Sequence, residues 1–207
     1  MNNKIITTMF ALTLITVSAP GVAHADGLIL RGGLNLSDAA TDPSIDADNQ
    51  EYRRGLNLAL LAEAGGGPAR LVAGVGYENR GIGVSTSLAD ATLRLDYVTI
   101  PVMLSLGTVP EMGSGWMPRL FVNVGVEPAF LISSNGSLED YDFDIEAERF
   151  DFGLRGEAGV EIPVSETAGI VLGAGYSRSV TNAAKDEDLE WYNRNIQIFG
   201  GVKVGMF

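Results

Sequence analysis

The feature that most constrains this chain is a strict alternation of apolar and polar side chains, repeated along almost its whole length. Between residues 150 and 164 the even positions are apolar or glycine, whereas the odd positions are charged residues, glycine or proline. A period of two is the pattern of a β-strand whose two faces meet different surroundings. The pattern occurs in eight segments and predicts an all-β chain, with strands at 28–36, 56–64, 71–77, 98–106, 120–132, 150–164, 170–176 and 196–206.

The connections between these segments alternate in length. The second, fourth and sixth are short or turn-like, at 65–68, 108–118 and 165–168, and contain glycine, proline or serine. The others are long and polar, at 38–51, 79–92, 133–148 and 182–192. This layout is typical of bacterial outer-membrane barrels, whose short turns are periplasmic. An even number of strands then places both termini in the periplasm. No segment after the N-terminal region has 18 consecutive apolar residues, which excludes a helical membrane protein.

A soluble barrel also alternates, but its interior is apolar and its exterior polar. Here the apolar face is continuous in most strands, which suits lipid, and the opposite face combines charges with glycine. The interior of an eight-stranded barrel is just wide enough for side chains to fill. We therefore predict an eight-stranded antiparallel up-and-down transmembrane β-barrel with a lumen filled by ion pairs. The predicted network consists of Arg31, Glu63, Arg70, Glu78, Arg119, Glu127, Asp151, Arg155, Glu157, Glu161 and Lys203.

The formal net charge is −12, which argues against a nucleic-acid partner. The acidic excess lies in the long connections, so the strands are nearly balanced, as a lumen of paired charges requires. Acidic residues cluster at 42–51 and 139–148, and carboxylates can bind calcium. Neither cluster has the glycine of a calcium-binding EF-hand loop at its required place. Solvated loops are the default interpretation, and no metal or cofactor site is predicted.

The sequence also predicts no catalytic residue. There is no cysteine, and the single histidine, His24, lies in the N-terminal segment. Histidine is the usual general base near neutral pH. Glu157 and Glu161 could in principle act as a carboxylate pair, but pairing with Arg155 and Lys203 explains them more simply. The glycine pairs at 74–76 and 173–175 do not stand between a strand and a helix, as a phosphate-binding loop would.

Residues 1–25 have the pattern of a signal peptide. Lys4 is followed by an apolar run at 5–17, and Ala23-His24-Ala25 has the small residues that signal peptidase accepts. The run is too short to span a bilayer as a helix. Cleavage after Ala25 leaves a barrel domain at 26–207.

Six arginines stand at the loop ends of the predicted strands, and Arg94, Arg178 and Arg194 have the parity of the lipid-facing side. A guanidinium there could bind the phosphates of lipopolysaccharide. The alternative is pairing with carboxylates near the loops, such as Glu51, Glu148 or Glu190. Aromatic residues near strand ends suit the interfacial belts of a membrane barrel, with ordinary packing as the alternative. These aromatics are Tyr52, Tyr97, Trp191 and Tyr192.

Four segments carry a resemblance to a known family. They are Arg31-Gly-Gly-Leu-Asn-Leu-Ser37, Gly74-Val-Gly-Tyr-Glu-Asn-Arg-Gly81, Leu95-Asp-Tyr-Val-Thr-Ile-Pro101 and Gly200-Gly-Val-Lys-Val-Gly-Met-Phe207. Almost end to end, the chain after residue 25 resembles the PorT-type outer-membrane β-barrel family. The C-terminal aromatic Phe207 resembles the signal read by the barrel-insertion machinery. The resemblance implies, for some members, an accessory role in secretion or assembly.

Three functions remain open from the sequence. The first is a non-enzymatic structural or surface-interaction barrel in contact with outer-membrane lipids. The second is a small-solute channel, and the third is an accessory component of a secretion or assembly system. The lumen charges distinguish the first two, because a paired network blocks flow and an open lumen conducts.

Overall fold

In the computed structural model, the residues described are 25–42, 50–85, 90–108, 117–138, 141–143, 148–182 and 190–205. The predicted signal peptide and Phe207 lie outside them, except for Ala25. These ranges hold ten β-segments, whose bounds follow. They are β1 (Gly27–Asp42), β2 (Gln50–Ala64), β3 (Ala69–Ser85), β4 (Asp90–Thr99), β5 (Val102–Gly107), β6 (Arg119–Leu138), β7 (Tyr141–Phe143), β8 (Phe150–Pro163), β9 (Ala168–Ser179) and β10 (Glu190–Gly205).

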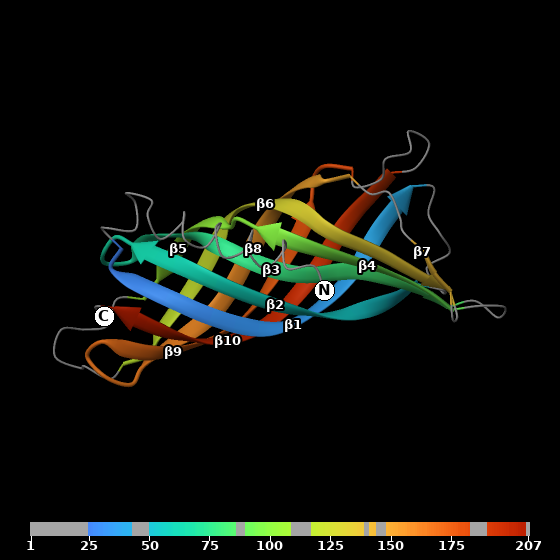
Figure 1. Ribbon diagram of the computed structural model, residues 1–207. Coiled ribbons are helices and arrows are strands. Elements are labelled where there is room, and N and C mark those ends of the chain that lie inside the picture. The colour runs from blue at the N-terminus through green and yellow to red at the C-terminus, as the bar shows by residue number, and fades with distance from the viewer. Residues whose placement is uncertain are drawn as a thin grey trace.

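All of these segments pair antiparallel in one sheet that closes on itself (Figure 1). β1 pairs with β2 on one side and with β10 on the other, and β2 pairs with β3. β4 and β5 both lie between β3 and β6, so together they form a single barrel strand. β7 is a short addition to β6, at the end of the barrel opposite the end of β10 (Figure 1). The fold is therefore the predicted eight-stranded antiparallel barrel.

The strands extend further toward the long connections than the alternation predicted. β3 continues to Ser85 and β6 to Leu138, although the sequence placed 79–92 and 133–148 in loops. Strand pairing continues there because backbone hydrogen bonds do not need an apolar face. The predicted strand at 98–106 begins earlier, at Asp90, and is interrupted at Ile100 and Pro101. Pro101 has no N–H to donate to the ladder, which explains the interruption.

The outward face is a continuous apolar surface. Leu30 is 57% exposed, Leu56 63% and Leu154 55%, and similar side chains occur on every barrel strand. A soluble monomer rarely exposes an apolar surface of this extent. In a membrane barrel this surface is the band that contacts lipid. None of the described residues forms a helix long and apolar enough to cross a membrane.

The inward face holds the predicted charged side chains and, in addition, an apolar layer that the sequence analysis did not identify. Charged side chains occupy both ends, and a buried apolar cluster lies between them. The middle cluster consists of Ile29, Ala59, Leu61, Val72, Met103, Phe121, Val171 and Phe199.

The two phenylalanine rings of this cluster pack against glycines, which have no side chain to occupy that volume. Phe121 is the cross-strand partner of Gly159, and a Cβ on Gly159 would lie 2.6 Å from the Phe121 ring. Phe199 is likewise the partner of Gly173, where an added Cβ would lie 2.7 Å from the Phe199 ring. An aromatic ring covering a glycine on the neighbouring strand is a recurrent device of β-sheets. Two of the eight side chains of the middle layer are therefore rings that lie over bare backbone.

Candidate functional site

The centre of the lumen network is Arg155 of β8, a buried side chain that contacts three other strands. Its Nη1 donates to Glu78 Oε1 of β3 at 2.7 Å and also to Glu127 of β6. Its Nε donates to Glu157 Oε1 at 2.7 Å, and its Nη2 donates to Gln197 of β10. One guanidinium thus ties together side chains from opposite walls of the barrel.

Arg31 of β1 forms a second tie across the lumen. Its Nη1 and Nη2 donate to the two carboxylate oxygens of Glu157 at 2.8 and 2.7 Å. This bidentate geometry is the strongest form of an arginine–carboxylate pair. The guanidinium also lies 4.3 Å from the centre of the Phe199 ring, which adds a cation–π contact. Arg31 therefore joins the charged layer around Arg155 to the apolar layer beside it.

Arg80 belongs to the same cluster, although the sequence analysis assigned it to a loop. Its Nη2 contacts Glu78 at 2.9 Å and Glu127 at 2.5 Å, and its Nη1 contacts Asp151 at 3.1 Å. The signal that could have found it is parity. Arg80 has the same phase as Glu78 on β3, so continuing the alternation by one step beyond the predicted strand places it in the lumen.

Lys203 is the centre of the second charged cluster, near the short turns. Its Nζ is fully buried and donates to Glu63 at 2.6 Å and to Glu161 at 2.8 Å. Arg70 donates to Glu63 at 2.7 Å, while Arg119 lies 3.6 Å from Glu161 and donates to Ser105 at 3.2 Å. All eleven residues of the predicted network therefore point into the barrel.

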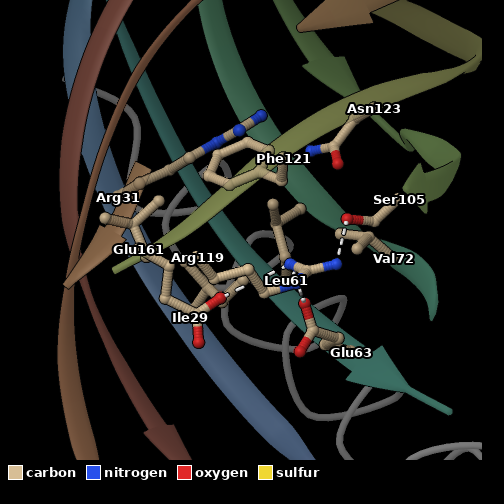
Figure 2. A pocket seen from close by; sticks show the side chains of 11 residues that line it. Ile29, Arg31, Leu61, Glu63, Val72, Ser105, Arg119, Phe121, Asn123 and Glu161 are labelled. Atoms are coloured by element: carbon tan, nitrogen blue, oxygen red, sulfur yellow. Dashed lines mark hydrogen bonds and ion pairs between the residues drawn. The ribbon is translucent and has the colours of Figure 1, made fainter. Parts of the chain in front are cut away.

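A small cavity lies between the two clusters. It measures about 20 Å³, which is room for a water molecule, and apolar and charged side chains line it. Figure 2 shows Arg119 reaching between Glu63, Ser105 and Glu161 at this cavity. Arg119 Nε and Asn123 Oδ1 are buried without a hydrogen-bond partner in the protein. A donor and an acceptor that both need a partner make this cavity suitable for water.

The charges of the two clusters balance when Arg80 is included. The eleven predicted residues carry one more acid than base, and Arg80 removes that difference. Unpaired charge inside a barrel costs several kcal/mol, so balance favours a lumen that stays closed. The resulting six acids and six bases are Glu63, Glu78, Glu127, Asp151, Glu157, Glu161, Arg31, Arg70, Arg80, Arg119, Arg155 and Lys203.

The three arginines assigned to the lipid-facing side occupy different environments. Arg94 Nε donates to Asp96 Oδ1 at 3.2 Å, and Arg194 Nη2 donates to Asp38 Oδ2 at 2.6 Å. Arg178 is exposed and has no side-chain partner among the described residues. The observed carboxylate partners are thus Asp96 and Asp38, and the side chains of Glu51 and Glu190, considered from the sequence, lie outside those described.

Two of the aromatic residues predicted for an interfacial belt differ in their exposure. Tyr52 is 61% exposed, whereas Tyr97 is fully buried, with the Arg80 guanidinium 5.1 Å from its ring centre. Tyr97 has the lumen parity of β4, so ordinary packing, the alternative to a belt, describes it. Most residues of the two acidic clusters lie outside the described residues. Within the described ranges, no group of three or more histidine, cysteine or acidic side chains is arranged to hold a metal ion.

Solved structures share this architecture. Neisserial surface protein A (NspA) superposes with a TM-score of 0.51 at 13% identity, covering 86% of this chain and 97% of that chain. OprG from Pseudomonas aeruginosa gives 0.49 at 15% identity, covering 88% and 97%. Ail of Yersinia pestis gives 0.46 at 14%, covering 86% and 99%. The likeness to NspA supports the fold alone. A comparison with curated proteins finds no match.

A closed eight-stranded sheet, apolar outside and charged inside, defines a small outer-membrane β-barrel protein. The sequence matches the family model of the outer membrane protein beta-barrel domain over residues 27–185. The chain belongs to that family.

Proposed function

We propose that this outer-membrane protein is a closed barrel that conducts no solute, has no enzymatic activity, and has a structural or surface-interaction role. The observation that carries the proposal is the contact set of Arg155. It joins Glu78, Glu127 and Gln197 from three other strands across the lumen. Opening a path there requires separating buried charges, which costs about 3–5 kcal/mol for one broken pair.

Planar-bilayer recording tests the closed lumen. The parent barrel is expected to give at most small and rare openings. The double variant Arg155→Ala/Glu127→Ala removes one base and one acid together, so it keeps the charge balance while deleting side-chain volume and the central tie. We expect it to open more often than the parent. Arg54→Ala is a control, because Arg54 is exposed on the outer face. A large, steady conductance of the parent would contradict the proposal and favour the solute channel.

The absence of enzymatic activity is supported by the state of the carboxylates. Glu157 accepts hydrogen bonds from Arg31, Arg155 and Asn123, and Glu161 accepts one from Lys203. Both are buried and held by cations, so neither is placed to exchange a proton with a substrate. We expect the refolded barrel to hydrolyse lipid acyl esters no faster than its Glu157→Gln variant. Hydrolysis that this substitution abolishes would overturn the assignment.

We further propose that the short turns and both termini are periplasmic. Asp26 N donates to Glu63 O and Gly205 N to Thr167 O, so both ends of the barrel chain lie beside the turns at 65–68 and 164–167. The chain contains no cysteine, which makes labelling unambiguous. Ser87→Cys, in a long connection, should react with a membrane-impermeant maleimide on intact cells, and Ser165→Cys should not. The reverse labelling would invert the topology.

Within its family, we propose that the protein is of the PorT type. The supporting element is Tyr97-Val-Thr-Ile100-Pro101, which spans the interruption between β4 and β5. Its backbone is held on both sides, because Ile100 N donates to Pro128 O and Pro101 O accepts from Gly74 N. An accessory role in secretion predicts that crosslinking in native membranes recovers a constant protein partner. Recovery of lipid alone would favour the structural role.

Lipopolysaccharide is the lipid partner we propose for Arg94, Arg178 and Arg194. Each stands on the outer face near the long connections, where the phosphorylated outer leaflet lies in this topology. Arg178 and Arg194 lie on neighbouring strands, whereas Arg94 lies on β4, away from both.

A further inference from the structure

Two of the three arginines on the lipid-facing side are direct cross-strand neighbours. Arg178 of β9 and Arg194 of β10 are register partners, and both side chains lie on the outer face. Residues paired in this way have Cβ atoms about 4.5–5.5 Å apart. Like charges placed opposite each other destabilise a sheet unless an anion lies between them. The sequence shows two separate arginines, and only the strand register brings them together.

Among the described residues, one carboxylate accepts a hydrogen bond from this pair of arginines. Asp38 accepts from Arg194 Nη2 at 2.6 Å, which offsets one of the two positive charges. Arg194 Nε is buried without an acceptor among the described residues, whereas the exposed Arg178 side chain has no side-chain partner among them. A guanidinium carries five N–H donors in a planar fork that suits phosphate oxygens. Arg178 therefore keeps its exposed donors for an external anion, and the two arginines with Asp38 carry one net positive charge.

The neighbouring residues indicate which anion. The next outward pair along the same strands is Tyr176 opposite Ile196, 47% and 41% exposed, and the apolar band continues below it. A tyrosine above an apolar band marks the membrane interface. An anion bound here is therefore at the level of lipid headgroups. A phosphate monoester carries about −1.5 to −2 charges near neutral pH, enough to bridge two guanidiniums.

Arg94 does not share this arrangement. It lies on β4, with β6 and β8 between it and β9, and its cross-strand partners are Asn135 and Gly81. Its Nε binds Asp96, which also accepts from Tyr77 at 2.9 Å. Arg94 is thus paired with a carboxylate of its own strand, and neither of its register partners is a cation. The three arginines therefore do not form one site.

We propose that Arg178 and Arg194 form a clamp for a phosphate monoester of an outer-leaflet glycolipid, the chemistry of lipopolysaccharide. Asp38 orients Arg194, and the Arg178 fork completes the site from the neighbouring strand. The inference rests on the outer-membrane placement and outward face of the proposed function, but it does not depend on a closed lumen.

The test measures lipopolysaccharide retained by the full chain after extraction from outer membranes in mild detergent. Retained glycolipid per barrel should fall about tenfold or more in Arg178→Gln/Arg194→Gln, since each charge-assisted hydrogen bond contributes a factor of this order. Arg54→Gln/Arg149→Gln removes the same charge from exposed positions outside the proposed site and should retain parent levels. Arg178→Lys/Arg194→Lys keeps the charge, loses the forks, and should be intermediate. An unchanged heat-dependent gel shift establishes that each variant is folded.

A titration of the refolded barrel identifies the ligand. Lipopolysaccharide should raise the unfolding temperature of the parent but not of the Arg178→Gln/Arg194→Gln variant, and phosphatase-treated lipopolysaccharide should have little effect on either. Equal retention in both double variants overturns the clamp, as does stabilisation by inorganic phosphate that matches the lipid. Conductance measured on the same samples distinguishes the closed-lumen proposal from the clamp proposal. A barrel that conducts but still binds lipopolysaccharide through Arg178 and Arg194 would refute only the closed lumen.

Discussion

Arg155 and Glu78 are 77 residues apart in the sequence, yet Arg155 Nη1 lies 2.7 Å from Glu78 Oε1 inside the barrel. The two residues belong to β8 and β3, which are not neighbours in the sheet. A contact of this kind forms only when the sheet has closed. The pair therefore links the stability of the closed barrel to the filling of its lumen.

Arg155→Ala should lower the free energy of unfolding by about 3–5 kcal/mol, because it leaves Glu78, Glu127 and Glu157 with too little positive charge in a buried site. Urea unfolding in detergent micelles, followed by the heat-dependent gel shift, measures the loss. Arg149→Ala is the matched control, since Arg149 is exposed just before β8. Equal stability of the two variants would show that the buried ion pairs of Arg155 do not stabilise the barrel.

Arg31→Lys tests the bidentate pair with Glu157. Lysine keeps the charge but cannot donate two parallel hydrogen bonds or stack on Phe199 in the same way. The expected loss is about 1.5–3 kcal/mol, the contribution of a hydrogen bond to a charged group. The measurement is the shift of the urea midpoint relative to Arg54→Lys, a change at an exposed position. A shift no larger than that control would mean that charge alone matters at position 31.

Gly159→Ala should destabilise the barrel by about 1–3 kcal/mol through overpacking. The added Cβ would lie 2.4 Å from Leu172 O and 2.6 Å from the Phe121 ring. Gly156→Ala in the same strand meets no atom within 4 Å and should be neutral, or stabilising by about 0.5–1 kcal/mol. Thermal unfolding of the two variants side by side provides the comparison. A tolerated Gly159→Ala would mean that Phe121 moves freely in the lumen.

Cleavage after Ala25 predicts that protein recovered from outer membranes begins at Asp26. Asp26 N donates to Glu63 O, and Asp26 Oδ2 accepts from Gly65 N, so the barrel strand is already fixed at this residue. Mass spectrometry of the intact protein measures the terminus. A mass that includes residues 1–25 would show an uncleaved N-terminal segment.

Local alternation was sufficient to predict the number of barrel strands, their antiparallel order and the face that each side chain takes, because a strand has a fixed period of two and each face here has its own solvent. It placed Arg155 and Glu78 on the inward face without any knowledge of their contact. It was less reliable at the strand ends. Arg80 was misplaced because a polar residue near a strand end resembles a loop residue.

The sequence by itself therefore determined the class of fold and which side chains fill the lumen. Only the tertiary structure decided the partners, because partners across a lumen depend on barrel closure and on the stagger between strands, and neither is encoded in a local period. On the outer face of the barrel, too, only the tertiary structure decided which residues are neighbours. Arg178 and Arg194 have equal parity in the sequence with Arg94, but the register of β9 against β10 makes two of them neighbours, whereas Arg94 lies opposite Asn135.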